Sequence, residues 1–108
     1  MSAAGAVLDA CVLVNASLRD TLLRLASEGT YRPYWSDQII EELERTLQQK
    51  LRKTPAQTAH LIEQMRRHFD NAWVSGYELL TLEMTNDPKD RHVLACAVKA
   101  RAREIVSF

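Results

Sequence analysis

Long hydrophobic runs are missing from this sequence. None approaches the ~18 residues that a membrane-spanning helix needs, and residues 1–6 carry neither the basic start nor the long apolar stretch of a secretory signal. An excess of either charge is also missing, because 14 basic residues balance 14 acidic ones, which excludes a basic coat for non-specific nucleic-acid binding. We therefore expect a cytoplasmic protein with no membrane partner.

Cysteine is scarce as well. Cys11 and Cys96 are far apart, form no Cys-x-x-Cys pair and each lie in an apolar run. This pattern predicts two buried thiols in a reducing compartment and argues against a disulfide framework or a structural zinc site. Repeats, low-complexity tracts and linkers are absent too, and 108 residues have room for one hydrophobic core. We expect a single domain over residues 1–108.

Short apolar segments predict the strands. The run 6–14 is almost wholly apolar and rich in Val, which is typical of a strand buried on both faces of a parallel sheet, and Asp9 is its one charge. Pro33 cannot donate to a ladder, so its segment is expected at an edge. Strand character at 73–74 and 77–80 is ambiguous. The candidate strands cover residues 6–14, 31–35, 73–74, 77–80 and 105–108.

Start and stop signals divide the rest of the chain into helices. Ser36 and Thr54 are preferred N-cap residues, and Gly29 suits the end of a first helix over 17–27. Asp87 followed by Pro88 predicts the start of the last helix. The stripes expected to face the core are Leu18, Leu22, Leu25 and Ala26; Ile40, Leu43, Leu47 and Leu51; Ala59, Ile62, Met65 and Phe69; and Val93, Leu94, Ala97 and Val98.

This order of elements predicts an α/β fold. A strand, several helices, a strand, a helix and a last strand are best arranged as a three-layer α/β/α sandwich around a central parallel sheet. Such sheets bind ligands at the carboxyl ends of their strands. The chain stops at Phe108 without the further element that usually covers an edge strand, so its C-terminal part is expected to be missing.

Several acidic residues do not suit a core. Asp9 is costly to bury, so it either has a strong partner, such as a helix cap, or faces a cleft at the end of its strand. Asp87 and Asp90 are explained by helix capping and the helix dipole. The remaining candidates lie on the middle helix, where helical phase does not choose among them and a solvated acidic face is the alternative: Glu41, Glu42 and Glu44.

Convergence of these acids would make a metal site. An Asp after the first strand, a Glu on the middle helix and an Asp at the start of the last helix could meet above the sheet as hard oxygen ligands for Mg²⁺ or Mn²⁺. The ion would neutralise their repulsion, activate a water and hold a phosphate.

Three segments carry a resemblance to a known family. The stretches 7–14 (VLDACVLV), 36–47 (SDQIIEELERTL) and 86–95 (NDPKDRHVLA) resemble the PIN-domain ribonucleases, and among them the VapC-type toxins of bacterial toxin–antitoxin pairs. The resemblance implies a parallel sheet between helices and an acidic cluster that holds Mg²⁺ or Mn²⁺ for RNA hydrolysis. It also implies an antitoxin protein as partner, and homodimers are common in the family.

The resemblance assigns roles by position. It gives catalytic and metal-binding roles to Asp9, Glu42 and Asp90, and so selects Glu42 over its neighbours. Asp87 is a candidate supplementary acid, with helix capping as its alternative role. Arg91 and His92 stand beside Asp90 in the sequence, which makes them candidate contacts to substrate phosphate, with solvation in the first helical turn as the alternative.

Two features depart from the family pattern. Cys11 replaces the polar residue, often Asn, that usually stands two places after the first aspartate. Family members also continue beyond the last strand into a turn with a fourth acidic residue, so we expect either a truncated chain or a site without that acid. The expected function is metal-dependent endoribonuclease activity. The alternatives are a catalytically silent PIN-like module that binds an antitoxin or itself and, last, a receiver-like domain, for which a suitable Lys near the final strand is lacking.

Overall fold

A four-stranded parallel sheet forms the centre of the protein. The computed structural model describes residues 4–107, without the side chain of Glu83. The strand order is β3-β2-β1-β4, and every neighbouring pair is parallel. Val7 of β1 lies opposite Tyr34 of β2 on one side and Ile105 of β4 on the other. The strands are β1 (Gly5–Leu8), β2 (Arg32–Ser36), β3 (Trp73–Val74) and β4 (Glu104–Val106).

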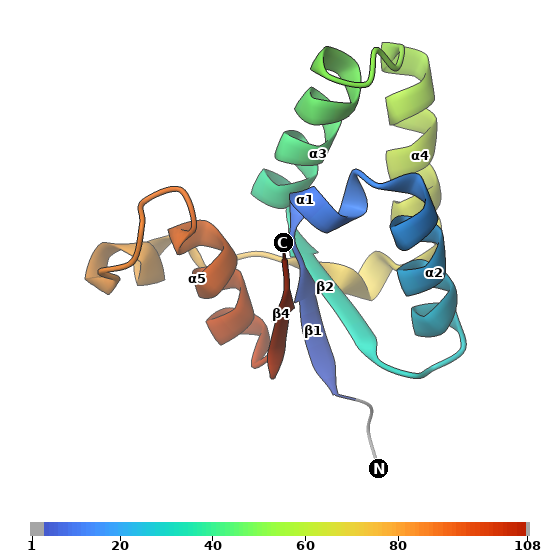
Figure 1. Cartoon of the computed structure of the whole chain (residues 1–108). Helices are drawn as coiled ribbons and strands as arrows, with labels where there is room; N and C mark the ends of the chain where they lie inside the picture. Colours follow the sequence, from blue (N-terminus) through green and yellow to red (C-terminus); the bar gives the residue numbers. More distant parts are fainter. Residues whose placement is uncertain (1–3, 108) are drawn as a thin grey trace.

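Helices cover both faces of this sheet. Figure 1 shows α5 on one side, and α2 and α4 on the other, with α3 beyond the carboxyl ends of β1 and β2. The predicted α/β sandwich with a central parallel sheet is therefore confirmed. The helices are α1 (Ala10–Leu13), α2 (Ala16–Ser27), α3 (Asp37–Gln49), α4 (Pro55–His68) and α5 (Arg91–Ala100), with 3₁₀ turns η1 (Asp70–Ala72) and η2 (Glu78–Glu83).

The core lies where these layers meet. Trp35 of β2 is fully buried and packs edge-on against Phe69 and Trp73, with ring centroids 6.0 and 5.3 Å apart. Leu8 and Leu43, both 0% exposed, belong to the same cluster. No helix within residues 4–107 has both the length and the apolar character to cross a membrane.

Local capping explains where the helices begin. The Ser36 hydroxyl accepts a hydrogen bond from the Ile39 N–H at 3.1 Å, as predicted for an N-cap. Thr54 and Gln57 exchange hydrogen bonds in a capping box, and Pro55 occupies the first helical position. Gly29 follows α2 with a φ of 81°, a conformation that Gly adopts without steric cost.

The first strand is shorter than predicted. It ends at Leu8, and most of the remaining apolar run forms the short helix α1 rather than a strand to residue 14. The Asp9 carboxylate accepts the Ala10 N–H and so starts that helix. Short apolar runs do not distinguish a buried strand from a buried helix, which explains the error.

The segment containing Pro33 was wrongly predicted as an edge. β2 lies between β1 and β3, and Pro33 pairs with Ala6 of β1. Pairing with β3 involves only Trp35 and Ser36. At Pro33, β2 therefore has a neighbour on one side alone, which accommodates the missing N–H donor.

The last third of the chain also differs from the prediction. Residues 78–83 form η2 instead of a strand at 77–80, and α5 begins at Arg91 instead of Pro88. The terminal strand ends at Val106, and Phe108 lies outside the described residues. Five side chains expected in the core are exposed instead: Leu25 (38%), Leu51 (48%), Ala59, Leu94 (37%) and Val98 (53%).

Candidate functional site

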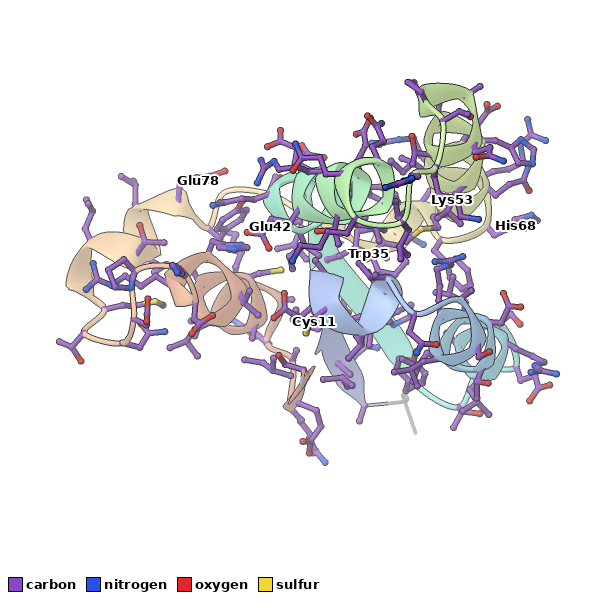
Figure 2. The ribbon with its side chains drawn as sticks, turned by 45° about the horizontal axis from the view of Figure 1, so that its top comes forward. Cys11, Trp35, Glu42, Lys53, His68 and Glu78 are labelled. Carbon is purple, nitrogen blue, oxygen red and sulfur yellow. The ribbon has the colours of Figure 1, made fainter. Side chains whose placement is uncertain are left out.

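A cleft opens at the carboxyl ends of the central strands. Figure 2 shows Cys11 of α1 and Glu42 of α3 near the place where these two helices meet α5. The cleft has a volume of about 700 Å³, and its walls include Asp9, Glu42 and Asp90. All three predicted acids therefore lie along one cleft, in the position at which open α/β sheets bind ligands.

Asp9 is fixed between the first helix and the last strand. Its Oδ1 accepts the Ala10 N–H at 2.7 Å, and its Oδ2 accepts the Ser107 hydroxyl at 3.1 Å. Its own N–H donates to the Val106 carbonyl at 3.1 Å. Asp9 therefore does both things that the sequence left open: its carboxylate caps α1, and its side chain lines the cleft.

Glu42 contacts a buried histidine. The Oε1 atom of Glu42 lies 2.8 Å from Nε2 of His92, and the two side chains are 36% and 6% exposed. By distance this is an ion-pair contact, although neither ring nitrogen forms a well-aligned hydrogen bond with a described residue. Of the three glutamates that the sequence left open, Glu42 is the one that lines the cleft, whereas Glu41 is exposed and Glu44 lies outside the lining.

Asp90 is the most accessible of the three acids. It occupies the N-cap position of α5, but its side chain makes no capping hydrogen bond. Within residues 4–107, both of its carboxylate oxygens lack a hydrogen-bond donor, and Oε2 of Glu42 does too. These oxygens are therefore available to a ligand in the cleft.

The donor chemistry suits a divalent ion. Carboxylate oxygens are the hard ligands that Mg²⁺ and Mn²⁺ prefer. Among the described residues, no three His, Cys, Asp or Glu side chains are gathered closely enough to coordinate one ion. The cleft thus offers ligands of the right kind without a finished coordination sphere, and neighbouring carboxylates repel one another unless a cation neutralises them.

Cys11 was wrongly predicted to be buried. It is exposed, with its Sγ atom 3.3 Å from the Ser107 hydroxyl and 3.8 Å from Asp9 Oδ2. The helical turn of α1 directs Val12 and Leu13 into the core and Cys11 outward, which a continuous strand would not have done. Cys96 is buried as predicted, and burial raises the pKa of its thiol to about 12.

The auxiliary candidates bind neighbouring parts of the protein. Asp87 Oδ1 accepts the Lys89 N–H at 3.0 Å, so it stabilises the turn before α5 and is not the N-cap that we expected. Arg91 Nε donates to the Asn86 carbonyl at 2.9 Å. His92 is 5% exposed and lines the cleft behind Glu42.

Two features of the site were not found from the sequence. The hydroxyl of Ser107 supports Asp9 from the end of β4, and His92 supports Glu42 from α5. A polar residue directly after the apolar pair Ile105 and Val106 was a usable signal for Ser107, because Asp9 follows the apolar residues of β1 in the same way. The pairing of Glu42 with His92 joins two distant helices and has no signal in local sequence.

These observations define an α/β protein with an acidic cleft at the carboxyl edge of a parallel sheet. A family model described as PIN domain matches residues 5–108. The chain therefore belongs to the PIN-domain family, whose members are generally metal-dependent nucleases. No curated protein and no solved structure matches the chain significantly.

Proposed function

We propose that this protein is a metal-dependent endoribonuclease that hydrolyses RNA phosphodiesters, with Asp9, Glu42 and Asp90 as the ligands of Mg²⁺ or Mn²⁺. The observation that carries the proposal is that these three carboxylates line one cleft of a PIN domain. The ion supplies activation of water and neutralisation of charge on the leaving oxygen.

The protein's own side chains position the three acids. Hydrogen bonds from Ala10 and Ser107 fix the Asp9 carboxylate. The buried imidazole of His92 contacts one oxygen of Glu42, and the Glu42 side chain lines the cleft. Orientation of ligands by neighbouring groups is a general requirement of metal sites. Asp90, which has no such restraint, is the ligand free to move toward an ion.

We further propose that the protein acts in the cytoplasm as the toxin of a VapC-type pair, with an antitoxin protein as partner and a homodimer as its assembly. The small PIN domain and the resemblance of its three motifs support the toxin role. The edge strand β4 supports self-association, because Ile105 is 39% exposed there. Mass measurement over a concentration series tests the dimer, and a strict monomer at high concentration contradicts it.

Cleavage of labelled RNA tests the nuclease proposal. We expect hydrolysis with Mg²⁺ or Mn²⁺ and none with a chelator, and Asp9→Asn should abolish it. Asp20→Asn is the matched control, because Asp20 is an exposed aspartate on α2 outside the cleft lining. Activity that survives both chelation and Asp9→Asn would refute the mechanism.

A further inference from the structure

Cations gather beside the acidic cleft although the chain as a whole is neutral. Arg45 and Lys50 line the same cleft as the three acids. A second cleft of about 640 Å³ shares Cys11 and Val14 with the first, and its walls reach Lys53. Figure 2 shows Glu42 on α3 and Lys53 on the loop that follows α3. The two clefts therefore adjoin at Cys11 and Val14, and their walls together extend from the acids to Lys53.

These cations follow one another in a row along α3 and the loop after it. Glu42, Arg45, Thr46 and Lys50 all line the first cleft; Arg45 stands three residues after Glu42, and Lys50, the C-cap of α3, stands four residues after Thr46. At ~1.5 Å per residue, Lys50 lies ~12 Å along the helix axis from Glu42. The buried side chains of α3 are apolar, whereas Arg45, Lys50 and Lys53 are exposed.

The charges in this row are not neutralised by the protein. Among the described residues, the side chains of Arg45, Lys50 and Lys53 form no ion pair or hydrogen bond. Arg19, which lines the same second cleft, differs because its Nη1 donates to the Leu13 carbonyl at 2.8 Å. Attraction between a cation and the carboxyl end of the helix dipole explains the presence of Lys50 at the end of α3. It does not explain the presence of Arg45 in the preceding turn or of Lys53 in the loop.

The other exit of the cleft lacks such a row. A third cleft of about 370 Å³ adjoins it through Gln38, Pro88 and His92 and is lined by Glu78 and by Arg91. The Nε of Arg91 is already bound to a backbone carbonyl. Lys89 lines the first cleft on this side, so the side toward η2 has two cations and Glu78, whereas Arg45, Lys50 and Lys53 lie along α3 with no acid among the described residues that line the second cleft. An anionic chain leaving the acids is therefore favoured along α3.

We propose that Arg45, Lys50 and Lys53 form a phosphate-binding track for single-stranded RNA on one side of the cleaved linkage. This proposal rests on the proposed nuclease function, since it takes Asp9, Glu42 and Asp90 as the reacting centre. Clefts of several hundred Å³ are of the size that small ligands such as a short stretch of nucleotides occupy. Cations that bind phosphates contribute sequence-independent affinity, which depends strongly on salt.

Equilibrium binding in the presence of EDTA tests the track without cleavage. The probe is a fluorescein-labelled oligouridine of about 16 nucleotides, measured by anisotropy over a range of salt concentrations. Each phosphate contact contributes about −0.7 to the slope of log K against log salt on single strands. The triple variant Arg45→Gln/Lys50→Gln/Lys53→Gln should therefore flatten that slope by about 2 and weaken binding at least tenfold at low salt.

A matched variant separates local binding from net charge. Arg24→Gln/Lys99→Gln/Arg103→Gln removes the same number of charges from exposed positions outside the acidic cleft and the two clefts adjoining it along α3 and toward η2. It should bind oligouridine like the unmodified protein. Urea unfolding of both triple variants should give unchanged midpoints, because the substituted side chains are exposed.

The outcomes distinguish the two proposals. Three results overturn the track. The track variant keeps the salt slope and the affinity of the unmodified protein, or both triple variants lose affinity equally, or the unmodified protein does not bind oligouridine. Cleavage of RNA by the unmodified protein in Mn²⁺ supports the nuclease function in any of these cases. Salt-dependent binding that needs the track, without cleavage in Mn²⁺, refutes the nuclease function and retains the track.

Discussion

Replacing Glu42 by Ala should destabilise the metal-free protein, whereas replacing Asp90 by Ala should not. Glu42 is the partner of His92, which is only 5% exposed. Loss of the carboxylate removes the 2.8 Å contact at Nε2 of a buried imidazole, and an interaction with a charged partner is worth about 1.5–3 kcal/mol. Because the Glu42 side chain is 36% exposed, solvent screens part of the interaction, and we expect about 1–2 kcal/mol.

Asp90 provides the contrast. Its side chain is exposed and makes no capping hydrogen bond, so Asp90→Ala should change the free energy of unfolding by no more than about 0.5 kcal/mol. Helix propensity does not explain a loss at Glu42, because Ala is the better helix former. Glu42→Gln keeps an oxygen at the position of the carboxylate and should restore most of the stability.

Urea unfolding and thermal unfolding, both in EDTA, measure these differences in stability. A loss of 1 kcal/mol corresponds to a decrease of roughly 4–8 °C in Tm for a domain of this size. A double-mutant cycle with His92→Leu should show that the loss at Glu42 depends on the imidazole. Equal stabilities of Glu42→Ala and Asp90→Ala, or a loss at Glu42 that persists without His92, would refute the reasoning.

Three further predictions concern the core and the titrating groups. In the native protein a thiol reagent should modify exposed Cys11 but not Cys96, whose pKa burial raises to about 12, and both should react after unfolding; rapid native labelling of Cys96 would contradict this. Burial raises the pKa of Tyr31 to about 12, above its ordinary 10.0. The protonated phenol therefore stabilises the folded protein fully below pH 10, and this stabilisation is lost as the pH rises toward 12. Tyr31→Phe should flatten this decline in the free energy of unfolding, measured by denaturation at a series of pH values. Leu43→Ala should lower the free energy of unfolding by about 2–5 kcal/mol, because Leu43 is 0% exposed in the core, and a loss below 1 kcal/mol would argue against that packing.

Local signals in the sequence were sufficient to place most helices. Ser36 and Thr54 predicted the starts of α3 and α4 correctly because capping depends on residues within one turn. The start of α5 was wrong, since Asp87 can stabilise either a turn or a helix, and here it binds the Lys89 N–H. The run after Leu8 was wrong because its hydrophobicity fits a short helix as well as a strand.

The candidate site was only partly predictable. Asp9 stood out as a charge in an apolar run, but helical phase did not separate Glu42 from Glu41 and Glu44, and only the family resemblance selected it. The contact of Glu42 with His92 depends on how α3 and α5 pack, and such long-range geometry is not written in any local pattern. The same holds for Ser107, which reaches Asp9 across a sequence separation of 98 residues.

The pairing of β1 with β4 determines when the site can form during synthesis. β1 lies between β2 and β4, so this sheet gains its last neighbour only after α5 has been made. At roughly 5–20 residues per second, a ribosome needs several seconds to pass from Asp9 to the residue that donates to its carboxylate. Until then Asp9 lacks the hydrogen bond from the Ser107 hydroxyl, so the order of translation delays completion of the cleft.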